Sequence, residues 1–401
     1  MIAPLPTPEL TTKVDGHDLS LIVAGEARLK ALLRLIDDAQ TSVKLFYYIF
    51  SDDAAGTLVR QHLIAACKRG VAVTLLVDGF GSSHLPDLFL DPLRLAGARV
   101  ERFLPHKGRR YLLRNHQKMA LADGATALIG GANIAEDYFW PVGDTPPWHD
   151  LVLVIRGPQV ARLNVYFDAL LGWMGTKRQR IRHLQGLLAA ASDTAGPLRW
   201  IMGGPFERLS PLARTLRADL DTARNVDMVQ AYFAPDFTFL RRLARVGARG
   251  RLRLITAARS DNVTTIGAAR HCYGRLLRNG ANLYEYRPAR LHMKLIVADD
   301  IVYIGSANYD TRSIFLNVEV MLRITDAGLA DQLRGYCQSQ LRHCQKIDRT
   351  WLARVSGPFR KLRWFLAYFL FTSIDYTITR RFNIGPDRRR WRPMRWRQAS
   401  D

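Results

Sequence analysis

The sequence of 401 residues is poor in cysteine and in acidic residues. Its four cysteines include no C-x-x-C pair and are too few for a disulfide framework in a chain of this length, so we expect free thiols. Acidic residues number 36 against 58 lysines and arginines, which gives a formal net charge of +22 at pH 7. The chain is therefore strongly basic, and its fold must be held by a core rather than by disulfides.

Long apolar stretches are also lacking. The first 25 residues combine prolines with scattered charges and show no pattern of a signal peptide. The longest unbroken apolar run, Trp364–Phe371, is far shorter than the ~20 residues that a membrane-spanning helix needs. We therefore expect no spanning helix. A composition of 48% hydrophobic and 23% charged residues is that of a globular protein and excludes disordered, collagen-like and coiled-coil classes.

The excess of positive charge comes mostly from arginine. The guanidinium fork matches two phosphate oxygens at once, so an arginine-rich surface favours partners that carry phosphate. Nucleic acid, an anionic membrane and a phosphorylated substrate all fit this description. Charge alone does not choose between them.

The two halves of the chain repeat the same pattern of elements. Residues 43–50 indicate a buried strand, 56–68 a helix and 71–77 a second strand. The second half has the same order, with a strand at 226–233, a helix from Pro235 to about Arg245 and a strand at 251–256. Such alternation predicts βαβ units and a mixed, largely parallel sheet in each half, flanked by helices. We expect two similar α/β lobes, 1–190 and 191–345, joined by a linker at 184–198 that is rich in small residues. A compositionally different tail, 346–401, follows.

Each half ends in a pair of adjacent strands that carries the same motif. The strands 117–122 and 126–130 flank a turn at Asp123-Gly124, and 293–298 and 301–305 flank one at Asp299-Asp300. Both fit H-x-K-x4-D followed by G-[GS]-x-N. The motif residues are His116, Lys118, Asp123 and Asn133 in the first half and His292, Lys294, Asp299 and Asn308 in the second.

The spacing places one imidazole and one ammonium together on each strand. Residues i and i+2 of a strand point to the same face, so His116 and Lys118 project towards a common ligand, as do His292 and Lys294. Each aspartate lies at the turn, an odd number of positions from its histidine. We therefore expect the aspartates to support the turn or an ion pair. The asparagines follow small residues and offer amide N–H groups to a phosphate oxygen.

The duplicated motif resembles the signature of the phospholipase D superfamily. The resemblance implies two pseudo-symmetric lobes whose motifs meet in one cleft, without metal or cofactor. One histidine attacks phosphorus to form a phosphohistidine, and the other protonates the leaving alcohol and then deprotonates the incoming one. The lysines and asparagines of both motifs would hold the phosphoryl oxygens. By family analogy His116 is the nucleophile and His292 the acid/base, although the sequence alone does not decide this.

The resemblance also implies a carboxylate that orients each histidine through its other ring nitrogen. Asn317-Val318-Glu319 follows the second motif, and Trp148-His149-Asp150 follows the first. On this basis we expect Glu319 to accept a hydrogen bond from His292, and Asp150 to accept one from His116.

Further blocks narrow the resemblance to bacterial cardiolipin synthases, in a short form without N-terminal transmembrane helices. They include 47–50, 78–82 and, most specifically, 305–313, and the resemblance covers roughly residues 20–345. It implies a transfer between two phosphatidylglycerol molecules that yields cardiolipin and glycerol, with phosphatidylethanolamine as an alternative donor. It further implies peripheral association with the bacterial inner membrane. The oligomeric state stays open.

Two other function classes are compatible with the sequence. A phospholipase D or a nuclease of the same fold would use water in place of the lipid alcohol, or a nucleic-acid diester in place of the lipid. A non-enzymatic basic module for nucleic acid would exploit the net charge, since phosphate neutralisation drives such binding. It would not require two intact His/Lys hairpins, so we rank nucleic acid low as a partner.

The tail 346–401 holds fourteen basic and four acidic residues. Within it, residues 359–378 interleave aromatic and aliphatic residues with Arg360, Lys361 and Arg363. This pattern is compatible with a helix packed on the lobes and with a segment that lies in the headgroup plane of an anionic membrane. We favour the membrane-associating segment.

Overall fold

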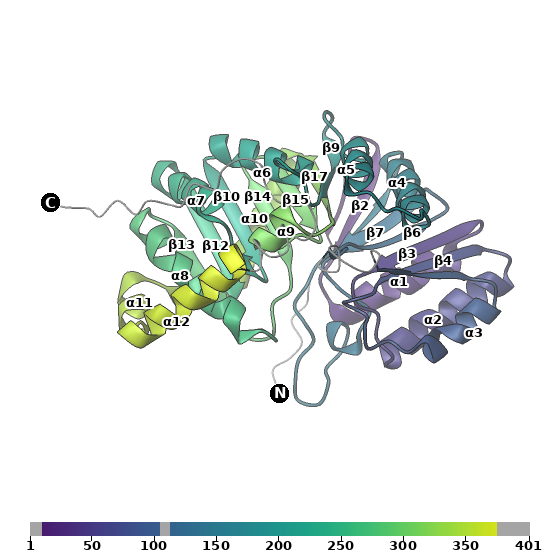
Figure 1. The fold of residues 1–401 in the computed structure, drawn as a ribbon. Helices are drawn as coiled ribbons and strands as arrows, with labels where there is room; N and C mark the ends of the chain where they lie inside the picture. Colours follow the sequence, from purple (N-terminus) through teal and green to yellow (C-terminus); the bar gives the residue numbers. More distant parts are fainter. Residues whose placement is uncertain (1–9, 105–112, 375–401) are drawn as a thin grey trace.

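The computed structural model describes residues 10–104 and 113–374 and divides them between two eight-stranded sheets, one from each half of the chain (Figure 1). The first sheet has the order β1 (Leu10–Val14), β2 (His17–Ile22), β8 (Val152–Arg156), β7 (Thr126–Gly130), β6 (Lys118–Ala122), β3 (Ser42–Tyr47), β4 (Ala72–Asp78) and β5 (Arg99–Phe103). The second has the order β18 (Cys344–Ile347), β13 (Asn282–Tyr286), β12 (Arg251–Ala257), β10 (Asn225–Gln230), β14 (Lys294–Ala298), β15 (Ile301–Gly305), β17 (Glu319–Thr325) and β9 (Leu198–Gly203). Two short strands, β11 (Phe233–Ala234) and β16 (Tyr309–Asp310), pair separately.

The two sheets share one topology. The order β2-β8-β7-β6-β3-β4-β5 matches β9-β17-β15-β14-β10-β12-β13, while β1 and β18 extend the two sheets at opposite ends of this common order. The predicted mixed α/β class with two similar lobes is thus confirmed.

The expectation of largely parallel sheets is wrong in detail. Parallel pairing is confined to β3–β4–β5 and β10–β12–β13, and the other neighbours in both sheets are antiparallel. The reason lies in the connections. Only the first part of each lobe crosses over through helices, whereas β6–β7–β8 and β14–β15–β17 include tight hairpins that force antiparallel pairing.

Helices cover both sheets. The first half contributes α1 (Gly25–Asp38), α2 (Ala54–Lys68), α3 (Asp87–Leu95), η1 (Glu136–Tyr138), α4 (Gln159–Met174) and α5 (Ile181–Ala190). The second half contributes α6 (Pro211–Thr222), α7 (Phe237–Arg249), α8 (Val263–Arg278), α9 (Thr311–Phe315), α10 (Ala327–Gln340), η2 (Leu341–His343), α11 (Arg349–Val355), α12 (Pro358–Phe369) and η3 (Leu370–Ile374). Many begin at a side-chain cap: Asp53, Asp236 and Asp326 each accept a backbone N–H from the first turn of α2, α7 and α10.

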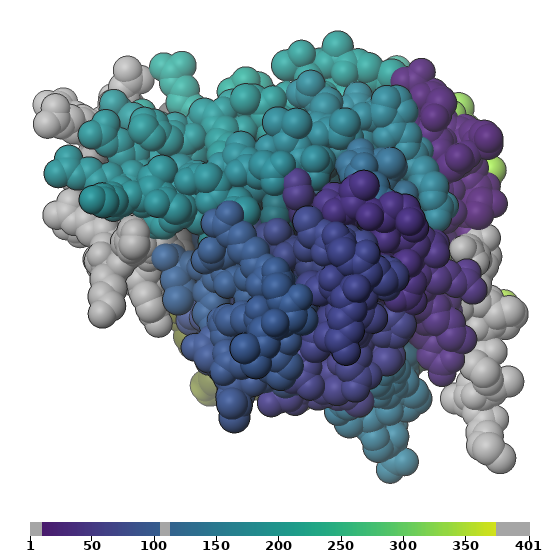
Figure 2. Space-filling view, turned by 90° about the vertical axis from the view of Figure 1, so that its right-hand side faces the viewer, coloured from purple at the N-terminus to yellow at the C-terminus, as the bar shows by residue number. Residues whose placement is uncertain are grey.

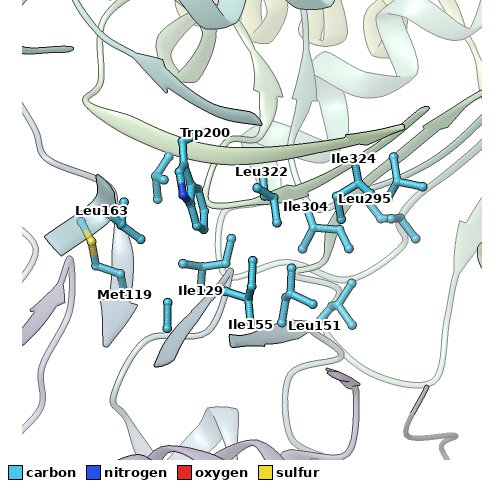
Figure 3. Close-up of a cluster of buried hydrophobic side chains, with 14 of the residues drawn as sticks. Met119, Ile129, Leu151, Ile155, Leu163, Trp200, Leu295, Ile304, Leu322 and Ile324 are labelled. Carbon is cyan, nitrogen blue, oxygen red and sulfur yellow. The ribbon is translucent and has the colours of Figure 1, made fainter. Parts of the chain in front are cut away.

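The two sheets share an apolar core, which makes the lobes one body. The largest buried cluster takes Met119, Ile129 and Ile155 from the first sheet together with Leu295 and Leu322 from the second. Figure 3 shows these side chains facing one another between the sheets. Separate clusters lie under α1–α3 in the first lobe and under α6–α8 in the second. The sheets therefore lie between outer helices, α1–α3 on one side and α6–α8 on the other, while α4, α5 and α10 add side chains to the core between the sheets.

The boundary between the halves is clear, but the linker is shorter than expected. The first sheet ends at Arg156 and the second begins at Leu198, with α4 and α5 between them. Residues 184–190, which the small-residue composition assigned to the linker, belong to α5 because Leu184 and Leu188 are buried in the core between the sheets. The segment that links the lobes is therefore residues 191–197.

The aspartates of the two motifs hold the hairpin turns. Asp123 has a positive φ of 54°, and its carboxylate accepts the backbone N–H groups of Gln40, Thr41 and Ser42 at the start of β3. Asp299, with φ of 47°, accepts those of Arg224 and Asn225 at the start of β10. The supporting role expected for them at the turn is what the structure shows.

The tail begins within β18, the edge strand of the second sheet, and its described part continues through α11, α12 and η3, which pack on the second lobe. Within residues 10–104 and 113–374, no helix combines the length and the apolar character that would cross a bilayer. The rest of the tail, residues 375–401, lies outside the described residues. Seen from the first-lobe side, the purple and blue residues of α1–α3 form the near surface (Figure 2), whereas Figure 1 shows α12 on the second lobe.

Candidate active site

The two histidines lie just ahead of equivalent central strands. His116 and Lys118 stand at the start of β6, and His292 and Lys294 at the start of β14. All four side chains are buried, and the most exposed of them, His116, reaches only 9%. Lys294 helps to lower the pKa of His116, and Lys118 helps to lower that of His292, so the two motifs lie within electrostatic range of each other.

Backbone hydrogen bonds join each motif to the opposite lobe. The N–H of His116 donates to the carbonyl of Val318 at 2.9 Å, and the N–H of His292 donates to the carbonyl of His149 at 2.8 Å. Each bond belongs to a short parallel bridge, Asn115 with Val318 and His149 with Leu291. The two bridges are counterparts under the pseudo-two-fold relation between the sheets.

These bridges set which carboxylate meets which histidine. Glu319 accepts from Nδ1 of His116 at 3.0 Å, and Asp150 accepts from Nδ1 of His292 at 2.7 Å. The expected pairing, Asp150 with His116 and Glu319 with His292, is wrong. Each carboxylate comes one residue after a bridge residue, Glu319 after Val318 and Asp150 after His149. This position lies at the lobe interface and faces the histidine of the other lobe.

The two carboxylates differ in how they are held. Glu319 also accepts from the hydroxyl of Ser306 and from Nδ2 of Asn317 at 3.4 Å. Asp150 accepts from its neighbour's backbone, the N–H of Leu151, at 2.7 Å. The residue equivalent to Ser306 is Gly131, where a Cβ would fall on the carboxylate of Asp150, closer than any van der Waals contact allows. The second residue of each G-[GS] step therefore matches the carboxylate beside it: Ser306 donates to Glu319, and Gly131 leaves room for Asp150.

Burial sets the protonation of this cluster. It lowers the pKa of His116 to about 4 and that of His292 to about 3, in each case more than the facing carboxylate raises it. Burial would raise the pKa of Glu319 and Asp150, but the side chains facing them, His116 first for Glu319 and Lys294 first for Asp150, hold it below its ordinary value. At pH 7 each site therefore holds a neutral imidazole whose Nδ1–H donates to a carboxylate. That leaves a lone pair on Nε2.

Each lysine folds back on its own histidine. Lys118 Nζ donates to the carbonyl of His116 at 2.6 Å, and Lys294 Nζ donates to that of His292 and lies 2.8 Å from its Nδ1. Burial lowers the pKa of Lys294 to about 8 and that of Lys118 well below its usual range. In their charged forms, the two lysines would stabilise negative charge on phosphoryl oxygens in this desolvated site.

The two asparagines are buried near the histidines but are placed differently. Asn133 Oδ1 accepts from the N–H of Ile49 at 3.2 Å, and its Nδ2 donates to the hydroxyl of Tyr138 at 2.9 Å. Asn308 is 4% exposed, and its Oδ1 has no hydrogen-bond partner within the described ranges. The phosphate contact expected of both stays a prediction, and in Asn133 one amide hydrogen remains for it.

The motif does not predict the aromatic side chains that surround the two histidines. The hydroxyl of Tyr138 lies 3.5 Å from Nε2 of His292, and its ring stacks on Trp148 with centroids 5.6 Å apart. Tyr48 stands edge-on to His116 at 4.8 Å, and Tyr232 to His292 at 6.3 Å. Tyr48 and Tyr232 follow the equivalent strands β3 and β10, and Tyr48 lies in the block 47–50 that contributes to the family resemblance. Tyr138 lies five residues after Asn133, where the second half has Ser313.

A buried carboxylate also fixes the segment that leads into the first motif. Asp78, at the end of β4, accepts the N–H of Asn115 at 2.9 Å and those of Phe80 and Gly81. Asp123 and Asp299 lie at the opposite ends of β6 and β14 from the histidines and do not join the site. Their turn positions direct them to the backbone at the starts of β3 and β10, in keeping with the supporting role expected for them.

The described residues contain no group of three or more His, Cys, Asp or Glu side chains arranged to hold a metal ion. What the site does contain is two sets of imidazole, carboxylate and ammonium, related by pseudo-symmetry and joined at one interface. This combination on two like α/β sheets defines an enzyme of the phospholipase D superfamily.

The comparisons with known proteins agree with that class. The family described as "Cardiolipin synthase, PLD-like domain" matches residues 32–171 and 216–341, and the chain belongs to it. It is 29% identical to Cardiolipin synthase 1 of Bacillus cereus over 350 residues, covering 83% of this chain and 68% of the relative. It is also 29% identical to Cardiolipin synthase A of Pseudomonas entomophila over 341 residues, covering 83% of this chain and 70% of that one.

Solved structures support the fold. Phosphatidylserine synthase of Haemophilus influenzae superposes with a TM-score of 0.66 at 14% identity, covering 94% of this chain and 97% of that chain. Polyphosphate kinase of Porphyromonas gingivalis superposes with a TM-score of 0.56 at 15% identity, covering 94% of this chain and 57% of that one. At these identities the likeness concerns the fold alone.

We predict that Gly131→Ala destabilises the protein because the added methyl group displaces the carboxylate of Asp150 from His292. A buried carboxylate that loses its partner costs about 3 kcal/mol in free energy of unfolding. Urea unfolding of G131A and of Gly172→Ala, where a Cβ meets open space in α4, provides the comparison. Equal stability of the two variants would show that Asp150 is not held as described.

We predict that Tyr138→Phe raises the pKa of His292 by about half a unit, because the lost hydroxyl no longer donates to the neutral Nε2. The ring keeps its stack on Trp148, so the fold persists. The ¹⁵N resonance of His292 Nε2 should change in Y138F. It should not change in Tyr303→Phe, which removes a buried hydroxyl bonded to Asp219 in the second lobe. An unaltered resonance in Y138F would refute the contact.

Proposed function

We propose that this protein is a cardiolipin synthase that transfers a phosphatidyl group between two phosphatidylglycerol molecules and releases glycerol. The observation that carries the proposal is the pair of neutral histidines, each backed by a carboxylate from the other lobe and accompanied by a buried lysine. Two such sets suit a double displacement, in which one imidazole bonds to phosphorus and the other handles protons. The names of the curated relatives supply the substrate class.

In the first step, Nε2 of the nucleophilic histidine attacks phosphorus of the first lipid, and the bond to the glycerol oxygen breaks. The second histidine takes up a proton on Nε2 when the negatively charged phosphodiester binds beside it, and it gives this proton to the departing alkoxide. In the second step, that histidine takes the proton from the primary hydroxyl of the second phosphatidylglycerol. The oxygen of this hydroxyl then attacks phosphorus, and the bond between phosphorus and Nε2 of the nucleophilic histidine breaks. Atoms and charges balance without any cofactor.

We assign the nucleophile to His116 and the acid/base role to His292. No hydrogen bond described in residues 10–104 and 113–374 occupies Nε2 of His116, whereas Tyr138 stands at Nε2 of His292. A free lone pair favours attack on phosphorus. Glu319 stabilises the positive charge that develops on His116 as the phosphohistidine forms, because it accepts from Nδ1.

Lys118 and Lys294 would hold the phosphoryl oxygens, with Asn133 and Asn308 as further amide donors. Phosphatidylethanolamine fits the same mechanism as a donor, since its phosphodiester is alike and only the leaving alcohol differs. Water in place of the second lipid would give phosphatidic acid, the product of a phospholipase D. These outcomes differ in their products and not in the site.

The protein would act as a peripheral enzyme at an anionic phospholipid membrane, the bacterial inner membrane in the first instance. The net charge of +22 and the substrate class support this placement. The relatives are named as lipid synthases, and their substrates reside in bilayers.

We predict that the purified protein, incubated with phosphatidylglycerol vesicles, forms cardiolipin and glycerol in equal amounts. His116→Ala should lower the rate by more than about a hundredfold and abolish the phosphoenzyme trapped by rapid denaturation, because no nucleophile remains. His84→Ala, which alters an exposed histidine of the first lobe, is the matched control.

Release of phosphatidic acid without cardiolipin would replace synthesis by hydrolysis as the function. Failure to act on phosphatidylglycerol or phosphatidylethanolamine, together with cleavage of plasmid DNA, would instead identify a nuclease of the same fold. A phosphoenzyme that persists in H116A would move the nucleophile to His292.

A further inference from the structure

α12 is fixed to the second lobe along one face. Trp364 and Ala367 are buried against α8, where Gly267 leaves room for the two helices to approach closely. The hydroxyl of Tyr368, on the same helix, donates to the carbonyl of Pro235 at 2.8 Å. The helix therefore has a defined orientation, and the opposite face of α12 points outwards (Figure 1).

The outward face of α12 is apolar. Phe359 is 87% exposed, Leu362 55% and Leu366 54%, and Phe369 and Leu370 are exposed as well. The spacing of these residues at three and four positions places them on one stripe of the helix. Large apolar side chains gathered in this way on a soluble surface mark a site of interaction.

Positive charge flanks this stripe. Residues 349–374 contain five basic residues and no acidic residue. Lys361 and Arg363 lie on the two sides of the stripe on the helical wheel, about 160° apart. An apolar face bordered by basic side chains is the pattern of a helix that lies in the headgroup region of an anionic bilayer.

The same side of the lobe leads to the candidate active site. α12 packs along α8, which begins at the exposed Val263. Two residues earlier, Asp261 accepts from the hydroxyl of Tyr232 at 2.6 Å, and the ring of Tyr232 faces His292. A membrane held against α12 would thus lie next to the segment that borders the acid/base histidine.

We propose that the outer face of α12, formed by Phe359, Leu362, Leu366, Phe369 and Leu370 with Lys361 and Arg363 beside them, docks the protein on an anionic lipid bilayer. The inference rests on the proposed function in that the substrate would be a lipid of that bilayer. It deepens that function by naming the surface that holds the enzyme at its substrate. A second copy of the chain is a less favourable occupant, because a symmetric contact would bring the basic flanks of both copies together.

The test compares sedimentation of the full-length protein with two kinds of vesicle, phosphatidylglycerol mixed with phosphatidylcholine and phosphatidylcholine alone. The wild type should pellet with the anionic vesicles. Leu362→Ser with Leu366→Ser should weaken that binding at least about tenfold, because the apolar contact is lost. Lys361→Glu with Arg363→Glu should weaken it by more than about fivefold per charge and only on anionic vesicles.

Matched variants control for general changes of hydrophobicity and charge. Leu88→Ser with Leu95→Ser removes two exposed leucines of α3 in the first lobe, and Lys177→Glu with Arg178→Glu reverses two exposed charges after α4. Both pairs should bind vesicles as the wild type does. Transfer activity on phosphatidylglycerol dispersed in detergent, measured in parallel, should be retained by L362S/L366S.

Vesicle binding by L362S/L366S that equals that of the wild type would overturn the proposal. So would a wild-type dimer in analytical ultracentrifugation that this double variant converts to a monomer without loss of vesicle binding. Absence of transfer by the wild type in detergent would contradict the proposed function instead, and the binding measurements would still decide the role of α12.

Discussion

The hydrogen bond between a neutral imidazole and a carboxylate of the opposite lobe is the interaction on which the rest of the structure depends. A carboxylate that is fully buried costs several kcal/mol unless it is paired and hydrogen-bonded. Glu319 and Asp150 are both completely buried, so each requires the histidine that faces it. The apolar core between the sheets makes this burial possible, and the backbone bridges at Val318 and His149 set the register of the two lobes. Neither lobe supplies both members of either active-site histidine–carboxylate pair by itself.

The pseudo-symmetry of the site is incomplete, and the differences support the proposal that His116 is the nucleophile and His292 the acid/base. On one side Glu319 is held by Ser306 and Asn317, and no described residue hydrogen-bonds Nε2 of His116. On the other side the shorter Asp150 faces Gly131 and has Lys294 close to the histidine, and Tyr138 stands at Nε2. A nucleophile needs an unoccupied lone pair, whereas an acid/base benefits from a partner that shares its proton. The two motif hairpins therefore differ in the contacts around their histidines, and the proposed division of roles rests on these differences.

Much of the fold and most residues of the candidate active site could be predicted from the sequence, because the signals that identify them are local. The hairpins, the turn residues and the identity of His116, His292, Asp150 and Glu319 follow from strand periodicity, motif spacing and resemblance. The pairing of these residues did not follow, because it depends on contacts between lobes that are far apart in the chain. The sequence did not predict α5 for a similar reason. Its small residues suggest a linker, whereas the helix is stabilised by burial of Leu184 and Leu188 in the core shared by the two lobes. Tyr138 has no counterpart in the second half, so the repeat that revealed the other residues could not reveal it.

The central claim is the cross-lobe pairing, and proton NMR of the imidazole groups tests it most directly. A ring Nδ1–H bonded to a buried carboxylate resonates far downfield, and the two signals can be assigned with His116→Gln and His292→Gln. The account predicts that Glu319→Gln shifts the signal of His116 and leaves that of His292, and that Asp150→Asn does the reverse. If Glu319→Gln shifted the signal of His292, and Asp150→Asn that of His116, each histidine would be held within its own lobe and the account would be contradicted.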